Sequence, residues 1–209
     1  MTRRPHPSSV TVASPIRLYG RRTVLRPLVA HDFEAWSEVR TRNTEWLVKW
    51  EPLPPPNSPD PAQSRDAFAG RCSARDRERQ SGSGYAFGIF VDGALAGEIN
   101  LNNVLRGALQ GATIGYWIDE ARAGRGYMAE SVVVLAQFAF DELRLHRLEI
   151  CIIPRNRNSR RVMEKLGIRE EGVAERFLEI NGTWEDHVRY GFTVEEWRDR
   201  REELAAAWL

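Results

Sequence analysis

The 209-residue chain has little cysteine, no long apolar run and almost no net charge. Its two cysteines, Cys72 and Cys151, cannot build a disulfide framework, so we expect a reducing, cytoplasmic environment. A formal net charge of +1 provides no overall field that would draw the protein to nucleic acid or to a membrane. The densest apolar stretch, residues 131–140, still contains Ser and Gln and falls short of the roughly 20 residues that a transmembrane helix needs.

Enough hydrophobic residues are present, at 42%, to build the core of one domain. Residues 1–14 are rich in Pro, Ser and Thr and show no apolar periodicity, so we expect a mobile tail there. They also lack the apolar segment of a secretory signal. Residues 15–209 are therefore predicted to form a single domain.

Turn signals and apolar periodicity divide this domain into strands and helices. Strands are predicted at 16–29 (one strand or a bent pair), 85–91, 94–104, 112–118, 147–153, 169–181 and 183–193. Helices are predicted at 30–48, 62–78, 126–143, 158–166 and from 194 onward. Asp92-Gly93 and Asn181-Gly182 favour tight hairpin turns. Hairpins on both sides of one strand–helix–strand unit indicate an α/β domain with a mixed sheet, not a doubly wound parallel one.

The segment from Tyr116 to Ala129 joins a predicted strand to a predicted helix through a loop that contains Gly124 and Gly126. The first N–H groups of a helix have no partner within the helix, and the helix dipole places partial positive charge there. Glycines let those amides approach an anion closely, and nearby arginines add charge. The pattern therefore indicates a phosphate or pyrophosphate site.

Several interpretations of this loop compete. Gly124, Gly126 and Ala129 fit the dinucleotide-binding fingerprint, but the acidic residue expected after the next strand is replaced by the sequence from Ile153 to Asn156. A P-loop would need Gly-Lys-Ser/Thr, which the segment lacks. An ordinary strand–helix turn with solvated arginines remains open on this segment alone.

The loop reads Ala121-Arg-Ala-Gly124-Arg-Gly126, and Asn156-Arg-Asn-Ser159, followed by Gly167, comes after the next predicted strand. These two elements resemble those of the GNAT acetyltransferase superfamily, whose pyrophosphate loop reads Gln/Arg-x-x-Gly-x-Gly/Ala. The chain has Ala in the first position of that loop. Trp46-Leu-Val-Lys-Trp50 and Trp184-Glu-Asp186-His187 resemble the RimJ branch, the ribosomal-protein-alanine N-acetyltransferases.

The resemblance implies a single-domain GNAT fold. Its mixed, mostly antiparallel sheet would have six to seven strands, with four to five flanking helices and a splayed central strand pair that holds CoA. It implies acetyl-CoA as cosubstrate, no metal, and direct acetyl transfer to a primary amine. The implied acceptor is the N-terminal α-amine of a protein, such as a ribosomal protein with N-terminal Ala. We expect a monomer or homodimer, without nucleic-acid readout or membrane binding.

Two other functions remain open at this stage. A small-molecule amine, such as an aminoglycoside, a polyamine or an amino acid, would need the same fold, because fold does not fix the substrate. A non-catalytic CoA-binding module is the second alternative. Many relatives of this branch carry Glu two residues before the Gly-Tyr-Trp of the central strand, and this chain has Thr113 there. A catalytic base at that position is therefore absent, which leaves the non-catalytic alternative open.

The resemblance also implies which residues contact the cofactor. The implied cofactor-binding residues are Tyr116, Trp117, Ile118, Arg122, Ala123, Gly124, Arg125, Gly126, Tyr127, Met128, Ala129, Asn156 and Ser159. A backbone N–H in the strand would stabilise the oxyanion that develops during transfer. The 3′-phosphate would be met by one or more of Arg122, Arg125, Arg157, Arg160 and Arg161.

The expected catalytic residues are Ser159, Asp186 and His187. Ser159 would donate toward the departing sulfur, and the Asp–His pair would receive or relay the proton of the amine. A modest base or a relayed water suffices, because an N-terminal α-amine has a pKa of about 8. A helix cap for Ser159 and a structural Asp–His pair are the alternatives.

The expected substrate-binding residues are Trp46, Trp50, Glu98 and Asn100. The two tryptophans would form an acceptor wall beside a loop with six prolines between residues 52 and 61. Glu98 and Asn100 share one face of a predicted strand, opposite Ile99 and Leu101, and would line the acceptor cleft. The alternatives are core tryptophans and a solvent-facing strand surface.

Overall fold

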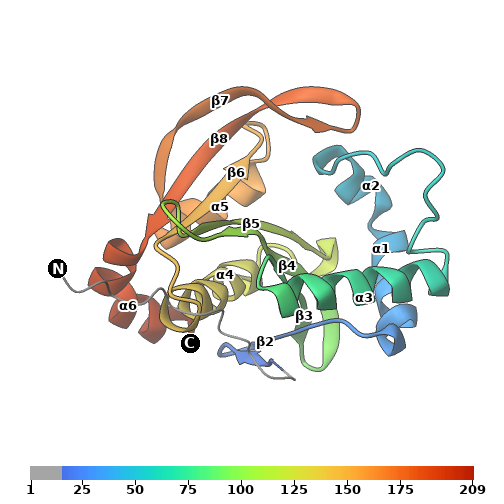
Figure 1. The fold of residues 1–209 in the computed structure, drawn as a ribbon, viewed down its shortest axis with the longest axis horizontal. Helices are drawn as coiled ribbons and strands as arrows, with labels where there is room; N and C mark the ends of the chain where they lie inside the picture. Colours follow the sequence, from blue (N-terminus) through green and yellow to red (C-terminus); the bar gives the residue numbers. More distant parts are fainter. Residues whose placement is uncertain (1–15) are drawn as a thin grey trace.

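A computed structural model describes residues 16–209, and the predicted tail at 1–14 lies outside the described residues. One eight-stranded sheet organises this part of the chain, in the order β1-β2-β3-β4-β5-β6-β8-β7 (Figure 1). The strands are β1 (Leu18–Tyr19), β2 (Thr23–Arg26), β3 (Tyr85–Val91), β4 (Ala94–Leu105), β5 (Gly111–Ile118), β6 (Arg147–Ile152), β7 (Arg169–Ile180) and β8 (Thr183–Thr193). The α-helices are α1 (Phe33–Arg42), α2 (Thr44–Leu47), α3 (Arg65–Ser81), α4 (Tyr127–Gln137), α5 (Arg157–Leu166) and α6 (Val194–Trp208).

The predicted α/β class and mostly antiparallel sheet are confirmed, but the expected six to seven strands are too few. Residues 16–29 form the bent pair β1 and β2, and β1 has only two residues, too few to produce a visible alternation. Both predicted hairpin turns are confirmed. Asp92-Gly93 and Asn181-Gly182 have positive φ at both residues, as a type I′ turn requires.

The main core lies between one face of the sheet and α4. Tyr85 and Phe87 alternate on β3, and their rings meet Phe138 edge-on at centroid distances of 5.3 and 5.9 Å. The residues from Met128 to Ala136 are buried all round the helix, because α5 and α6 also pack against α4. The opposite face of the sheet carries α1 and α3, where Trp36 packs on Phe68 at 4.9 Å.

The predicted helix over 30–48 is wrong in its continuity, because the chain breaks at Asn43 into α1 and α2. The Asn43 side chain is only 2% exposed and donates to the Val39 carbonyl and to Asp119 Oδ1. Its Oδ1 accepts the N–H of Glu120. Asparagine side chains compete with backbone hydrogen bonds in this way, so a tertiary contact ends the helix.

The splayed central strands are confirmed. β5 and β6 are parallel neighbours over only three residue pairs, from Gly111↔Arg147 to Thr113↔Glu149. Beyond that point β5 stays paired with β4 as far as Ile118, and β6 stays paired with β8 as far as Ile152. The two strands therefore part at the centre of the sheet while each keeps its outer partner.

A buried carboxylate joins α4 to the start of β2. Glu130 is 1% exposed and accepts the backbone N–H groups of Arg22 and Thr23 at 2.6 and 2.7 Å. The same carboxylate accepts Nε of Arg22 at 2.9 Å. The first turn of α4 and the entry into β2 are thus fixed to each other.

Replacing Glu130 by Ala is expected to lower the free energy of unfolding by about 3 kcal/mol, because two buried N–H groups lose their acceptor. Glu130→Gln retains a side-chain oxygen and is expected to cost less. Denaturant unfolding measures both values. The exposed Glu202→Ala on α6 is the control, expected within about 0.5 kcal/mol of wild type. A Glu130→Ala protein as stable as this control would contradict the anchoring role.

Candidate active site

A cavity of about 700 Å³ opens where β5 and β6 part. Its lining comes from the end of β5, the loop that follows it, the starts of α4 and α5, and the segment from Trp46 to Glu51. The lining residues that sequence analysis expected are Trp46, Trp50, Tyr116, Trp117, Ile118, Arg122, Ala123, Gly124, Gly126, Tyr127, Met128, Ala129, Asn156 and Ser159. One site therefore brings together most of the expected cofactor residues and the two tryptophans.

The glycine loop, residues 119–126, begins at a fixed point. Asp119 is 1% exposed and caps the short 3₁₀ helix η3 (Glu120–Arg122) by accepting the N–H of Ala121. It also accepts hydrogen bonds from Arg42 Nη2 at 2.6 Å and Asn43 Nδ2 at 2.9 Å. Burial alone would raise the pKa of Asp119, but these hydrogen bonds outweigh it and lower the pKa below its usual value. Asp119 thus keeps its charge and fixes the loop to α1 and α2.

The loop ends on two glycines in left-handed conformations, with φ of 75° at Gly124 and 87° at Gly126. Gly126 directly precedes α4, so the N–H groups of the first helical turn are exposed to the cavity side. A Cβ atom at Gly126 would lie 3.2 Å from Arg22 Nη2 and 3.3 Å from the Trp208 ring, whereas Gly124 faces open space. Backbone conformation thus requires both glycines, and close packing also requires Gly126.

The backbone of β5 faces the cavity at alternate residues. The N–H of Asp119 donates to the Ala96 carbonyl at 2.8 Å, so Asp119 and Trp117 direct their backbone groups toward β4. Those of Tyr116 and Ile118 therefore point the other way, into the gap. Trp46 Nε1 donates to the Ile118 carbonyl at 3.1 Å and joins α2 to this edge.

The aromatic wall, Trp46 and Trp50, is half-buried and held by cations. Lys49 Nζ lies 5.5 Å from the ring centroids of both tryptophans, and the Arg155 guanidinium lies 4.9 Å from that of Trp50. These contacts keep the two rings at the cavity instead of in the protein core.

The β7–β8 hairpin arches over this side of the sheet, and its tip reaches the segment after α2 (Figure 1). The N–H of Asn181 donates to the Glu51 carbonyl at 2.9 Å. Gly182 packs beside Leu53, since a Cβ atom there would lie 3.4 Å from Leu53 Cδ1. The hairpin tip and the proline-rich loop therefore meet beside the cavity.

The charges around the cavity are mostly positive. The cationic lining residues are Lys49, Arg122, Arg155, Arg157, Arg161 and Lys165. Of the arginines expected for a 3′-phosphate, Arg122, Arg157 and Arg161 line the cavity, and Arg125 and Arg160 do not. Arg160 donates instead to the Tyr190 hydroxyl at 3.1 Å. Anionic groups are thus favoured at the loop and α5.

At the start of α5 the structure separates two expected roles. Asn156 caps the helix, and its Oδ1 accepts the N–H of Ser159 at 3.2 Å, so the capping role falls on Asn156. The Tyr116 hydroxyl donates to the Ser159 carbonyl at 3.4 Å. Burial raises the pKa of Tyr116 well above its usual value, so this hydroxyl stays protonated. The resemblance gives this hydroxyl no role.

The structure does not bring Glu98, Asn100, Asp186 or His187 to the lining of this cavity. Glu98 is 1% exposed, accepts Trp36 Nε1 at 2.5 Å and pairs with Arg71 at 2.6 Å, beneath α1 and α3. Its face of β4 is covered by helices, because α1 and α3 pack there, so the solvent-facing alternative is also wrong for Glu98.

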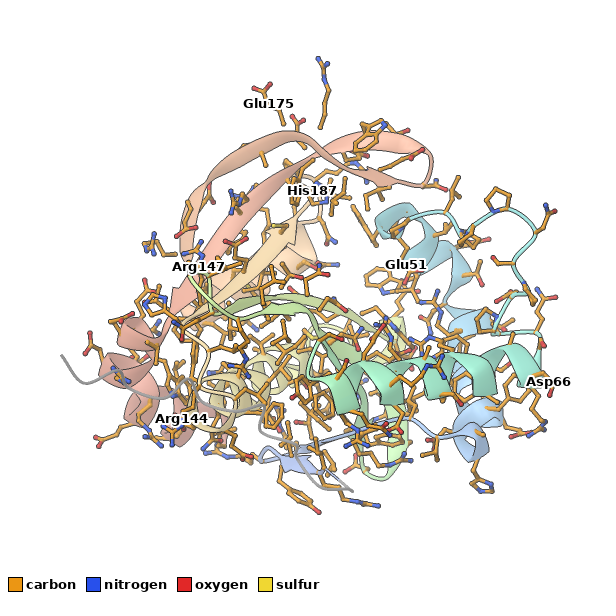
Figure 2. The ribbon with its side chains drawn as sticks, viewed as in Figure 1. Glu51, Asp66, Arg144, Arg147, Glu175 and His187 are labelled. Atoms are coloured by element: carbon orange, nitrogen blue, oxygen red, sulfur yellow. The ribbon has the colours of Figure 1, made fainter. Side chains whose placement is uncertain are left out.

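Asp186 and His187 lie on β8, in the β7–β8 hairpin. Figure 2 labels His187 there. His187 is 3% exposed, with Nδ1 2.9 Å from the Glu185 carbonyl and its ring edge-on to Phe177. Asp186 Oδ1 accepts the N–H of Arg176 at 2.8 Å. Both side chains thus have partners within the hairpin.

One cavity-lining carboxylate was not anticipated from the sequence. Glu51 follows the 3₁₀ helix η2 (Val48–Trp50), and Arg40 donates to both of its carboxylate oxygens at 2.7 Å. Burial would lower the pKa of Arg40, but its hydrogen bonds to Glu51 raise it, so the guanidinium stays charged. Its place directly after Trp50, a residue of the expected aromatic wall, is the feature of the sequence that could have pointed to Glu51.

Metal ligands and membrane-spanning helices were sought among the described residues. Within residues 16–209, no group of three or more His, Cys, Asp or Glu side chains is arranged to hold a metal ion. None of the helices described there has the length and apolar character that a bilayer crossing requires.

Known proteins resemble this chain over most of its length. The family model described as "Acetyltransferase (GNAT) domain" matches residues 22–169. "Probable N-acetyltransferase YjcK" of Bacillus subtilis is 36% identical over 81% of this chain and 93% of its own length. "[Ribosomal protein uS5]-alanine N-acetyltransferase" of Escherichia coli is 28% identical over 89% of this chain and 95% of its own length.

Among solved structures, "Mycobacterium smegmatis RimJ in complex with CoA-disulfide" superposes with a TM-score of 0.82 and 31% identity, over 92% of this chain and 93% of that one. The matched GNAT model covers both the glycine loop and the parted strands. The chain therefore belongs to the GNAT acetyltransferase family and is an acetyl-CoA-dependent N-acetyltransferase related to the ribosomal-protein acetyltransferases.

Proposed function

We propose that this enzyme acetylates the N-terminal α-amine of a protein, such as a ribosomal protein with N-terminal Ala, in the cytoplasm and as a monomer or homodimer. The proposal rests mainly on the lining of one cavity. The glycine loop and the end of β5 line one part of it, which suits the cofactor, and the aromatic wall lines another part, which suits the acceptor. The similarity to the uS5-alanine enzyme of Escherichia coli supports this choice of acceptor.

The residues present fit acetyl-CoA. The N–H groups from Gly124 to Ala129 suit the pyrophosphate, because a helix N-terminus after positive-φ glycines is an anion site. Arg122, Arg157 and Arg161 line the cavity and suit the 3′-phosphate. The backbone groups of Tyr116 and Ile118 suit an extended, amide-bearing arm, which pairs with them as an added strand would.

Transfer to an amine places four demands on the protein: to position the amine, to stabilise the oxyanion, to protonate the leaving thiolate, and to let water accept the proton that the amine nitrogen loses. A backbone N–H of β5 that points into the gap would stabilise the oxyanion. Ser159 lines the cavity and is proposed to donate toward the sulfur. The Tyr116 hydroxyl lies against the same turn of α5 and remains a proton donor. Asp186 and His187 have no part in this proposal, because neither residue lines the cavity.

The acceptor is tested by thiol release from acetyl-CoA with peptides that begin with Ala, Ser or Met. We expect turnover of these peptides and loss of turnover when the α-amine is blocked, even with an internal lysine present. A panel of aminoglycosides, polyamines and free amino acids is the comparison. Turnover of these small amines alone would overturn the proposed acceptor and leave the family assignment intact.

Gly124→Ala is expected to weaken acetyl-CoA binding by about 5- to 30-fold, because a non-glycine residue at φ of 75° costs roughly 1–2 kcal/mol. Isothermal titration calorimetry measures the affinity. Gly70→Ala on α3 is the matched control, because a Cβ atom there meets nothing within 4 Å. Equal affinity in the Gly124→Ala and Gly70→Ala proteins would show that the loop does not cradle the cofactor.

A further inference from the structure

Glu51 stands out because it is the only carboxylate among the described residues that line the cavity. Its side chain is 31% exposed, so it is neither buried nor free in solvent. In Figure 2 it lies beneath α2, at the side of the gap where the hairpin tip arrives. Nothing in the resemblance to the acetyltransferase family assigned a role to this side chain.

Arg40 holds the Glu51 carboxylate in one orientation. The two guanidinium nitrogens donate to separate carboxylate oxygens, each at 2.7 Å, which is the bidentate geometry that fixes both planes. Arg40 is itself fixed, with its guanidinium 5.0 Å from the Trp117 ring centroid and 5.8 Å from that of Trp36. Each carboxylate oxygen has a second lone pair, so Glu51 can still accept hydrogen bonds from a ligand.

The charges around the cavity make this carboxylate unusual. The six cationic side chains of the lining repel a positively charged ligand. An α-amine with a pKa of about 8 reaches the enzyme mostly as ammonium at neutral pH. Glu51 is the place in the described lining where such a group finds an opposite charge.

The backbone of Glu51 is also held by the tip of the β7–β8 hairpin. Its carbonyl accepts the N–H of Asn181, so the hairpin tip supports the backbone that carries the carboxylate. Trp46, in the same segment, is bonded to the Ile118 carbonyl at the edge of β5. Glu51 is thereby held in register with the strand edge along which the acetyl donor is proposed to lie.

We propose that Glu51 binds the ammonium group of the acceptor, and that Arg40 is the positioning residue that orients Glu51. The assignment rests on the proposed function, because it concerns the acceptor half of that site. In this proposal one side chain, Glu51, recognises the free amine, and other residues bind the cofactor.

The test is the Glu51→Gln variant, which keeps the shape of the side chain and removes its charge. The Michaelis constant for an N-terminal Ala peptide is expected to rise about 10- to 100-fold, the effect of losing a hydrogen bond to a charged group. The dissociation constant for acetyl-CoA is expected to stay within about twofold of wild type. Glu45→Gln, an exposed carboxylate on α2, is the control and should change neither value.

A second measurement separates amine recognition from a structural effect. The dissociation constant of the peptide from the CoA-bound enzyme, where no acetyl group can be transferred, is compared with that of an analogue that carries a hydroxyl in place of the α-amine. Wild-type enzyme is expected to prefer the amine by about tenfold or more, and Glu51→Gln to lose that preference. Arg40→Lys, which keeps the charge without the two-pronged geometry, is expected to lose part of it.

An unchanged preference in Glu51→Gln would overturn the assignment of Glu51, whatever happens to stability or to kcat. The proposed function fails separately, if wild-type enzyme turns over small amines and no peptide. In that case the same amine-to-hydroxyl comparison is made on the small amine that is turned over, and an unchanged preference would again overturn the role of Glu51.

Discussion

The parting of β5 from β6 after three residue pairs is the constraint on which the site depends. A sheet interior normally satisfies its backbone groups on both sides, and here β5 gives up one side from Ile114 onward while β4 satisfies the other. The structure limits the cost of this opening. Trp46 occupies the Ile118 carbonyl, and the alternation of β5 directs only every second residue into the gap. The exposed backbone edge becomes a surface for an extended ligand.

Two buried carboxylates set the position of the loop that borders this gap. Asp119 fixes its beginning to the junction of α1 and α2, and Glu130 fixes the helix at its end to β2. Arg22 connects the second anchor to the loop itself, because its Nη1 donates to the Arg125 carbonyl at 3.1 Å. The backbone of the glycine loop is therefore held by charged groups that do not line the cavity. This division leaves the cavity side of the loop to main-chain N–H groups and arginines.

Local chemistry accounts for what the sequence made predictable. Asp92-Gly93 and Gly124 through Gly126 require backbone conformations that few residues adopt, so their positions mark turns without knowledge of the fold. Asn43, Glu98 and His187 behaved differently. Asn43 and Glu98 have partners far away in the sequence, and His187 packs edge-on against Phe177 of the neighbouring strand β7. These contacts broke a predicted helix and buried two expected site residues. Glu51 could not be predicted as a site residue from the sequence. Its place in the site depends on its contact with Arg40 and on the absence of other carboxylates from the described lining, and both follow from the fold.

The contact between Asn181 and the Glu51 carbonyl joins two segments from opposite ends of the domain. The cavity also draws on β5 and the starts of α4 and α5, so no contiguous part of the chain contains it. Contacts between distant segments form late in folding, because the intervening chain must first be ordered. The lining of the cavity is thus complete only when the segment 46–51 meets the end of β5 and the starts of α4 and α5. A fragment of the chain that lacks any of these segments would lack part of the cavity, so the whole site requires the folded domain.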